Sequence, residues 1–307
     1  MAQRKTHLVS VRLHYFQTVA RAGSIRGAAQ SLNIAPSAIS RTLRALEDEL
    51  GTSLFERTRQ RLRLTSAGEI LLYYARASAA ELDRAAGFIG DLAGLRRGSV
   101  SIAAIESVTR GLLPDVLRKF WKHHPHIRVD VMTIGSQQAL EAVVQSDCDL
   151  ALAFDVRVPK TTQRLASVNL PLGALMRPDH ALARRRSLRL RDLAGEKLLL
   201  SDASLALGQT IDTAITDAGI EFGIRVSTNS ISLMTDLALR GEGVTMQTRV
   251  GVERELSRRE LVFVPLADPQ LRPRKLLLVA RSKAHLPGAP AAFAKLLGEA
   301  MDALKRD

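Results

Sequence analysis

The 307-residue chain contains one cysteine, Cys148, so no disulfide can form within it. A disulfide-built secreted scaffold is thereby excluded, and a reducing compartment is favoured. Long apolar runs are also missing: no segment approaches the ~20 apolar residues that span a bilayer, and the polar, basic start of the chain lacks the apolar core of a signal peptide. The sequence therefore predicts a cytoplasmic protein with no membrane-spanning segment.

Several catalytic signatures are absent as well. There is no nucleophile elbow, no phosphate-binding glycine loop and no pair of acids at a useful spacing, so we expect no catalytic residues, no cofactor and no enzyme. The cluster His123-His124-Pro125-His126 lies at an expected helix end, where histidine complements the helix dipole, and no Cys, Asp or Glu set accompanies it. No metal site is expected there, and Cys148 is interpreted as a small core residue.

Positive charge is abundant and unevenly distributed. The formal net charge is +13, and residues 1–98 carry 15 Lys and Arg against 8 Asp and Glu, a net of +7. A polyanion such as duplex DNA is the natural partner of such a segment. The alternative is a basic surface with no partner, because net charge says nothing about geometry.

Apolar periodicity near the start of the chain predicts three helices. The first ends at Ala22-Gly23, the second follows Ser24 as its N-cap, and the third runs from Pro36 to Gly51. The residues expected to point inward are Leu13, Phe16, Val19, Ala20, Ile25, Ala28, Ala29, Leu32, Ile39, Leu43, Leu46 and Leu50. Two short helices joined by a tight turn are typical of a helix-turn-helix, whose second helix lies in the major groove of DNA.

The outward residues of the third helix suit DNA binding. Ser37 and Ser40 offer hydroxyls for phosphates or base edges, and Arg41 and Arg44 offer guanidinium groups for guanine or phosphate. The alternative is an ordinary solvated helix face.

Residues 52–64 follow a strand-turn-strand pattern with an arginine at every second position. These are Arg57, Arg59, Arg61 and Arg63. Such a β-ribbon, or wing, can hold the DNA backbone or the minor groove beside the recognition helix. The alternative is that some of these arginines are only solvated, so the group as a whole indicates DNA binding more strongly than any single arginine does.

Taken together, these motifs resemble the DNA-binding region of LysR-type transcriptional regulators. The resemblance rests on Phe16, Gly23-Ser24, Ala28-Ala29, Leu32, residues 36–41, Leu46-Glu47, Leu50-Gly51, residues 54–57 and residues 64–68. It implies that Ser24 and Ser37 contact phosphates, that Ser40, Arg41 and Arg44 lie in or near the groove, and that dimers bind an interrupted A/T-rich palindrome. Where many relatives have Thr-Gln, this chain has Ala35-Pro36.

A long helix is expected from Thr65 to about Leu92. Apolar or small residues recur there every three or four positions, namely Leu71, Tyr74, Ser78, Leu82, Ala85, Ile89 and Leu92, as in a coiled coil. The resemblance implies that two such helices pair to form a dimer. The alternative is a helix that packs only within its own chain. Residues 93–98 contain two glycines and lack this pattern, which predicts a hinge.

From Ser99 onward, short apolar strands alternate with amphipathic helices. Strands are expected at 100–105, 127–132, 150–154, 172–176, 198–200, 225–227, 244–246 and 275–280, and helices at 112–123, 137–145 and 290–304. Over residues 100–154 this β-α-β-α-β order predicts a parallel sheet with right-handed crossovers, that is, an α/β fold. The stretch resembles the LysR-type effector domain, which is similar to periplasmic solute-binding proteins; the matching residues are 110–114, His124-Pro125, 149–152 and 241–243.

The expected organisation is therefore α/β with an N-terminal winged helix-turn-helix at 1–64, a linker helix and hinge at 65–98, and an effector-binding domain at 99–307. This last domain consists of two α/β subdomains, the first at about 99–164 and 266–307 and the second at about 165–265.

Ligands of such sheets bind outside the carboxyl ends of the strands, where helix N-termini offer free N–H groups. The candidate effector residues are Ser107, Gly135, Ser136, Phe154, Ser201, Asn229, Met246 and Gln247. Each of the serines could equally be a helix cap. Because Ile105 stands where many relatives have a hydroxyl and Glu106 adds negative charge, the predicted effector is more apolar or less anionic than a small dicarboxylate.

The sequence thus predicts a DNA-binding transcription regulator that senses a small molecule. Its expected partners are duplex DNA, the effector, RNA polymerase and further copies of itself, as a dimer or a dimer of dimers. The alternatives are an architectural DNA-binding protein without a ligand and, as a weaker class, an enzyme built on a solute-binding-like domain.

Overall fold

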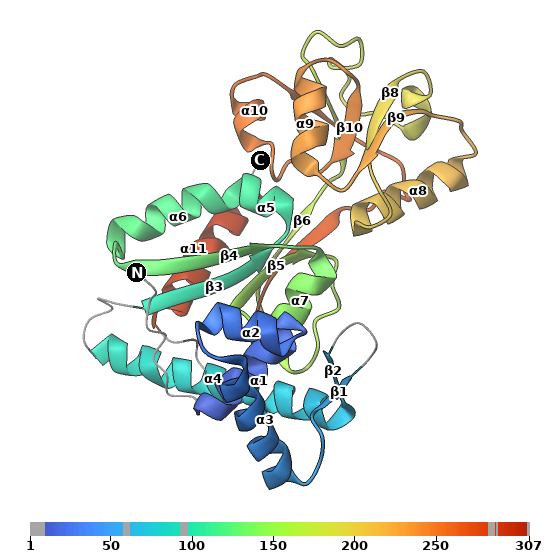
Figure 1. Cartoon of the computed structure of the whole chain (residues 1–307). Coiled ribbons are helices and arrows are strands. Elements are labelled where there is room, and N and C mark those ends of the chain that lie inside the picture. The colour runs from blue at the N-terminus through green and yellow to red at the C-terminus, as the bar shows by residue number, and fades with distance from the viewer. Residues whose placement is uncertain (1–9, 58–61, 93–97, 282–285, 287, 306–307) are drawn as a thin grey trace. The chain divides into compact units, whose positions relative to one another are not determined.

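A computed structural model of the chain describes residues 10–57, 62–92, 98–281, 286 and 288–305. The chain divides into two compact units, one made mainly of Met1–Gly94 and the other of Leu95–Val144 with Cys148–Asp307 (Figure 1). Each unit has its own hydrophobic core.

The first unit begins with the three expected helices. They are α1 (Val11–Ala22), α2 (Ile25–Leu32) and α3 (Pro36–Leu50), followed by the strands β1 (Phe55–Arg57) and β2 (Leu62–Leu64) and the long helix α4 (Ser66–Leu92). Gly23 and Gly51 end α1 and α3 in the left-handed conformation, with φ of +63° and +65°. Glycine adopts this conformation without a steric cost, which is why both helices end where the sequence indicates.

The core of this unit is built around Phe16, which is fully buried. The other buried residues of this core are Val19, Ala28, Ala29, Ile39, Leu43, Leu46 and Leu54. The ring centroids of Phe16 and Phe55 lie 5.4 Å apart. The inward face of the helices is therefore as predicted, with one exception. Leu50, the last residue of α3, is 47% exposed.

The wing is a short antiparallel hairpin, in which Phe55 pairs with Leu64, Glu56 with Arg63 and Arg57 with Leu62. The start of α4 packs tightly under it: a Cβ on Gly68 would lie 2.1 Å from the carbonyl oxygen of Leu54. Only glycine fits at this position, and α4 therefore starts in contact with the wing.

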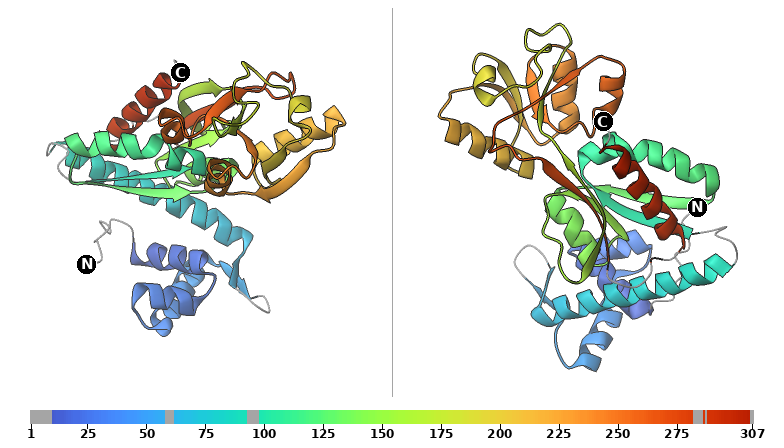
Figure 2. Two further views of the ribbon diagram at one scale, coloured as in Figure 1. Left: turned by 90° about the horizontal axis from the view of Figure 1, so that it is seen from above. Right: turned by 180° about the vertical axis from the view of Figure 1, so that it is seen from behind.

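The second unit contains two five-stranded sheets, each with helices on both faces (Figure 2). The first sheet has the order β4-β3-β5-β12-β6. Its strands are β3 (Gly98–Ala104), β4 (Ile127–Thr133), β5 (Leu150–Phe154), β6 (Thr162–Leu170) and β12 (Arg274–Arg281), and its helices are α5 (Glu106–Arg110), α6 (Leu112–His123), α7 (Ser136–Val144) and α11 (Gly288–Ala303).

Alternation along the strands explains this layering. Large residues such as Ile102 and Leu152 share one core with Phe120 of α6 and Phe293 of α11. Their small neighbours, such as Ala103, belong to a second core with α7. Because successive strand residues point to opposite faces, one sheet buries both sets, and the strands appear as continuous apolar runs.

The second sheet has the order β11-β7-β10-β8-β9. Its strands are β7 (Gly173–Met176), β8 (Lys197–Ser201), β9 (Gly223–Thr228), β10 (Val244–Gln247) and β11 (Val262–Pro265), and it is covered by η1 (Leu190–Leu193), α8 (Ala206–Ala218), α9 (Ile231–Leu239) and α10 (Glu253–Ser257). Leu198 and Leu200 face the core that includes Ile211 of α8, whereas Leu199 faces Met234 of α9.

The predicted parallel sheet is confirmed, whereas one predicted subdomain boundary is misplaced. Strands β4, β3 and β5 pair in parallel, and the later strand β12 makes this sheet mixed because it runs antiparallel to β5 and β6. In the second sheet, β7 runs antiparallel to β10 and β11. The predicted boundary of the second subdomain, near Leu165, falls inside β6, and the whole of β6 belongs to the first sheet. Strand β6 pairs with β12 in the first sheet, so the second subdomain begins only after Leu170.

Candidate functional site

The exposed face of α3 brings the predicted recognition residues together. Ser37, Ser40, Arg41 and Arg44 line one shallow hollow with Ala45 and Asp48. Ser37 and both arginines are exposed, and Ser40 is half-buried. Among the described residues, neither Arg41 nor Arg44 forms an ion pair or a hydrogen bond, so both guanidinium groups are available to an external anion.

Ser24 has a structural role that the sequence also indicated. Its Oγ accepts a hydrogen bond from the backbone N–H of Gly27 at 3.1 Å and so caps α2. The side chain is exposed, and its own hydroxyl proton remains free to be donated. Capping and phosphate contact are therefore compatible at this residue.

The turn between α2 and α3 forms a second hollow. It is lined by Arg26, Ala29, Gln30, Asn33, Ile34, Ala35 and Pro36. Sequence reasoning missed Arg26 and Gln30, which lie in the first and second turns of α2. Their exposed positions opposite the inward Ala28-Ala29 pair could have identified them.

The wing is held to α3 by a single carboxylate. Oε1 of Glu47 accepts hydrogen bonds from the backbone N–H groups of Leu54 at 2.8 Å and Phe55 at 3.3 Å. On the opposite strand, the N–H of Leu62 donates to the carbonyl of Gly23 at 3.2 Å. Glu47 thus fixes β1 relative to the helix that carries Arg41 and Arg44.

Of the predicted wing arginines, Arg63 is exposed on β2. The backbone of Arg57 pairs with Leu62, but its side chain lies outside the described residues, as do Arg59 and Arg61 altogether. Their contact with DNA stays a prediction.

In the second unit, Ser107 lies on α5 and is only 7% exposed. It is covered by Gly251, at which an added Cβ would lie 2.9 Å from the carbonyl oxygen of Ser107. Gly251 has a φ of +98°, which favours glycine. The two subdomains therefore meet directly over this predicted effector residue.

Gly135 and Ser136 lie at the start of α7, at the carboxyl end of β4. The Oγ of Ser136 accepts a hydrogen bond from the N–H of Phe154 at 3.1 Å. The guanidinium carbon of Arg274 lies over the Phe154 ring, 5.3 Å from the ring centroid. These three predicted residues form one group at the carboxyl ends of the first sheet's strands.

The residues predicted on the second sheet differ in accessibility. Asn229 is exposed after β9, whereas Ser201, at the end of β8, is 1% exposed. Met246 is fully buried in the core with Leu198, so its position indicates packing rather than a pocket wall. Gln247 is 2% exposed; its Nε2 donates to Oγ1 of Thr235 at 3.3 Å, but its Oε1 has no partner among the described residues.

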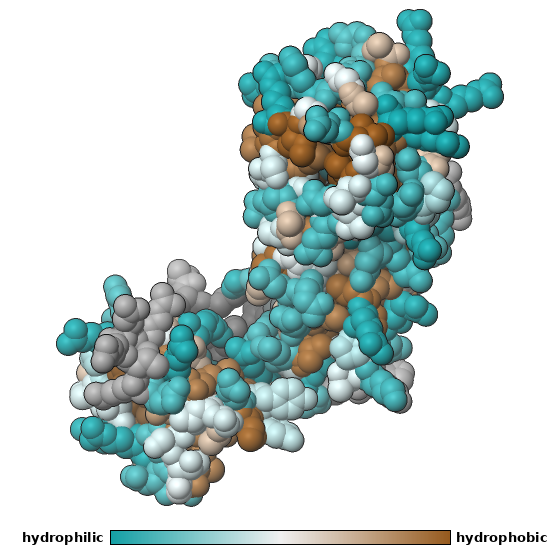
Figure 3. Space-filling view, turned by 90° about the vertical axis from the view of Figure 1, so that its right-hand side faces the viewer, coloured by the Kyte–Doolittle hydropathy of each residue, from teal (hydrophilic) through white to brown (hydrophobic). Residues whose placement is uncertain are grey.

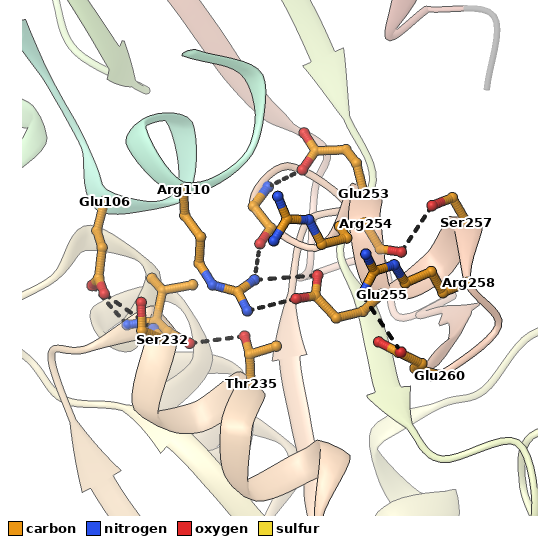
Figure 4. A network of polar contacts seen from close by, with 12 residues as sticks. Glu106, Arg110, Ser232, Thr235, Glu253, Arg254, Glu255, Ser257, Arg258 and Glu260 are labelled. Carbon is orange, nitrogen blue, oxygen red and sulfur yellow. Dashed lines mark hydrogen bonds and ion pairs between the residues drawn. The ribbon is translucent and has the colours of Figure 1, made fainter. Parts of the chain in front are cut away.

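Figure 4 shows a polar seam between the subdomains that sequence reasoning missed. The carboxylate of Glu106 on α5 reaches the first turn of α9, and Arg110, one turn further along α5, forms an ion pair with Glu255 of α10 at 2.7 Å. Arg110 also donates to the carbonyl of Gly251. The spacing of Glu106 and Arg110 by four residues places both on one helical face, but nothing in the sequence identifies their partners.

Glu253 lies in the same seam. Burial raises the pKa of its carboxyl above the ordinary value of 4.5. This effect outweighs the lowering of the pKa by the hydrogen bonds that the N–H groups of Glu253 and Gly251 donate to the carboxylate. The charge of Glu255 raises the pKa further, and the charge of Arg110 lowers it. An added Cβ on Gly111 would lie 2.1 Å from Oε2 of Glu253, so this side chain also touches the turn that follows α5.

Two models of one protein family match the chain. One, described as bacterial regulatory helix-turn-helix protein of the lysR family, matches residues 11–69; the other, described as LysR substrate binding domain, matches residues 93–302 and so more than half of the chain. The chain belongs to the LysR family. It is therefore a DNA-binding transcription regulator with an effector-binding domain and not an enzyme, which confirms the family, the fold class and the function predicted from the sequence.

This LysR-family chain is similar over nearly its full length to proteins of the same organisation. It is 29% identical to a probable nitrogen assimilation transcriptional activator of Synechococcus elongatus, over 93% of each chain. Its fold matches a full-length OxyR variant of Pseudomonas aeruginosa with a TM-score of 0.71, at 20% identity over 98% of this chain and 97% of that one. It also matches CbnR in complex with its target DNA, with a TM-score of 0.61, at 20% identity over 94% and 98%.

In the described part, no group of three or more His, Cys, Asp or Glu side chains could hold a metal ion. None of the described helices combines the length and apolar character needed to cross a bilayer.

Proposed function

We propose that this LysR-family regulator inserts α3 into the major groove of duplex DNA. The observation that carries this proposal is the exposed face of α3, where Arg41 and Arg44 have no partner among the described residues and lie beside the hydroxyls of Ser37 and Ser40. An unpaired guanidinium group on a helix of groove-fitting size can bond guanine or a phosphate. The structure solved for CbnR with its target DNA supports the same use of this domain.

The wing would then contact the flanking backbone or minor groove. Arg57, Arg59, Arg61 and Arg63 supply the charge, and the hydrogen bonds of Glu47 to β1 keep the wing beside α3. Ser24 would add a phosphate contact through its free hydroxyl proton.

The proposed assembly is a dimer formed through α4. Large apolar side chains on this helix are exposed, among them Ile70 at 62%, Tyr74 at 65% and Ile89 at 67%. A second α4 helix is the partner that would cover this face. A cytoplasmic location and contact with RNA polymerase belong to the same proposal.

Further association, as a dimer of dimers, would use the effector domains. Figure 3 shows patches of apolar side chains on a mostly hydrophilic face of the molecule. Val131 and Met132 on β4 are exposed, as is Ile224 on β9, and both strands lie at the edges of their sheets. Exposed edge strands with apolar side chains are suited to association between copies of a chain.

The effector would bind between the two subdomains. Ser107, Gly135, Ser136 and Phe154 lie at the carboxyl ends of the first sheet's strands, and Ser201, Asn229 and Gln247 at those of the second. The buried, unpaired Oε1 of Gln247 supports the proposal, because an acceptor in that state costs about 1–3 kcal/mol until a donor reaches it. Met246, being wholly in the core, would support the site only indirectly.

The test of DNA binding is Arg44→Ala in the full-length chain, measured by fluorescence anisotropy on duplexes from its own regulated region. If Arg44 contacts a base, its loss should weaken DNA binding by about 1–3 kcal/mol, or roughly 5- to 150-fold in Kd. The loss should also relax the preference for one base at one position of the site. The matched control is Arg12→Ala, which removes an exposed arginine of α1 that is paired with Glu49 at 2.6 Å.

An Arg44→Ala protein that binds as tightly as Arg12→Ala would contradict the placement of α3. A loss that is equal on all sequences would instead assign Arg44 to a phosphate. Isothermal titration against a metabolite panel separates a sensor from an architectural protein, since only the former shows saturable binding.

A further inference from the structure

The N-terminus of α9 is occupied by a side chain from the other subdomain. Oε2 of Glu106 accepts a hydrogen bond from the N–H of Ile231 at 2.7 Å, and its Oε1 accepts from the N–H of Ser232 at 3.0 Å and from Oγ of Ser230 at 3.2 Å. Figure 4 shows this carboxylate lying directly against the first turn of the helix. Both carboxylate oxygens are therefore in use.

This helix end is the type of place where an anionic ligand would bind. The first N–H groups of a helix have no partner within it, and the dipole adds positive charge there. In α9, Ser230 caps the N–H of Leu233 at 3.2 Å, and Glu106 takes the N–H groups of Ile231 and Ser232. No backbone N–H of this first turn, Ile231–Leu233, is left for an external anion.

A second contact supports the same closed arrangement. Arg110 lies one turn from Glu106 on α5 and pairs with Glu255, both side chains being at most 20% exposed. Gly251 packs on Ser107 between these two contacts. Helix α5 thus contacts α9 through the carboxylate of Glu106 and α10 through the guanidinium group of Arg110.

We propose that Glu106 is an internal anion that determines the class of effector. It fills the anion-binding end of α9, so a carboxylate or phosphate effector is excluded there by charge and by the lack of donors. The negative charge of Glu106 favours an effector that is neutral or cationic at this end. The unpaired acceptor that remains, Oε1 of Gln247, favours one that carries an N–H or O–H donor. The inference rests on the proposed effector site between the subdomains.

The test uses the full-length protein and acetate, with acetamide as a neutral probe of the same shape, at constant ionic strength. Glu106→Ala frees the two N–H groups, so acetate should raise its Tm saturably and acetamide should not. The control is Glu299→Ala, which makes the same charge change on the exposed face of α11. The rise in Tm with acetate should be several-fold smaller in this control and in the parent protein than in Glu106→Ala.

Hydrogen exchange on the unaltered protein is the second measurement, and it does not depend on whether Glu106→Ala folds. The amides of Ile231 and Ser232 should exchange roughly tenfold or more slowly than first-turn amides without a partner, such as those at the start of an uncapped exposed helix. Acetate should leave their exchange unchanged.

The proposal is overturned if acetate stabilises the parent protein as much as Glu106→Ala, if acetate and acetamide act alike on that variant, or if the Ile231 and Ser232 amides are unprotected. Duplex binding and metabolite titration, measured separately, report on the proposed function. Absence of duplex binding or of metabolite binding would contradict the proposed function, and the effect of acetate on Tm could still be interpreted by itself.

Discussion

Glu47 offers a direct test of how the wing is attached to the recognition helix. Its carboxylate accepts the N–H of Leu54 at 2.8 Å, and Leu54 is 1% exposed. In Glu47→Ala this buried donor has no acceptor, because the neighbouring strand β2 pairs with residues 55–57 and not with the Leu54 N–H.

The expected magnitude follows from that geometry. A buried donor left without an acceptor costs about 1–3 kcal/mol, and the longer bond to Phe55 adds little. The control is Glu49→Ala, which removes the same charge from the same helix. Its carboxylate is 64% exposed and is paired only with the exposed Arg12, so its loss should cost at most about 1 kcal/mol.

Hydrogen exchange resolved by peptide is the appropriate assay, because the one tryptophan, Trp121, lies in the second unit. Amides around residues 53–57 should exchange on the order of tenfold faster in Glu47→Ala than in Glu49→Ala, as about 1.4 kcal/mol corresponds to tenfold. DNA affinity should fall in the first variant only. Equal exchange and equal affinity in the two variants would refute the role of Glu47.

Two further predictions concern the seam and are read from Trp121 fluorescence during urea unfolding. Gly251→Ala places a Cβ against Ser107 at a φ of +98° and should destabilise the second unit by about 1–3 kcal/mol. The control is Gly195→Ala, which should not destabilise it because no atom lies within 4 Å of the new Cβ. Equal urea midpoints for the two variants would contradict the close packing at Gly251. Burial raises the pKa of Glu253 in the folded protein above 4.5, because it disfavours the ionised carboxylate. The contribution of this group to the free energy of unfolding is therefore fully present below pH 4.5 and is lost as the pH rises through the folded-state pKa. The stability gain of Glu253→Gln over the parent should therefore grow with pH across that window, and a constant difference would contradict the assignment.

Much of the fold follows from local patterns in the sequence. Helix α6 begins and ends where its amphipathic pattern does, and β5 coincides with five consecutive apolar residues, because each is decided by local periodicity and burial. Strand β6 was not predicted: it carries Gln163, Arg164 and Ser167 and is largely exposed over its first half, so it has no apolar run. Its place in the sheet depends on pairing with β12, more than 100 residues away.

The candidate sites divide in the same way. The exposed residues of α3 could be identified because helix geometry alone decides which side chains face outward. In the effector domain, the positions after each strand were identifiable, but accessibility was not. Ser107 is covered by a glycine from another subdomain, and the partner of Glu106 lies 125 residues further along the chain. Such contacts depend on tertiary packing, which no local pattern encodes.

The central claim is that α3, with its unpaired arginines, binds a groove of duplex DNA. The most direct measurement is the affinity of the full-length protein for duplex DNA as a function of salt, for the parent and for the double variant of Arg41→Ala with Arg44→Ala. The account predicts tight binding in dilute buffer that falls about a thousandfold or more between low and moderate salt, and a shallower salt dependence in the double variant. Affinity that is indifferent to salt, or equal for the two proteins, would contradict it.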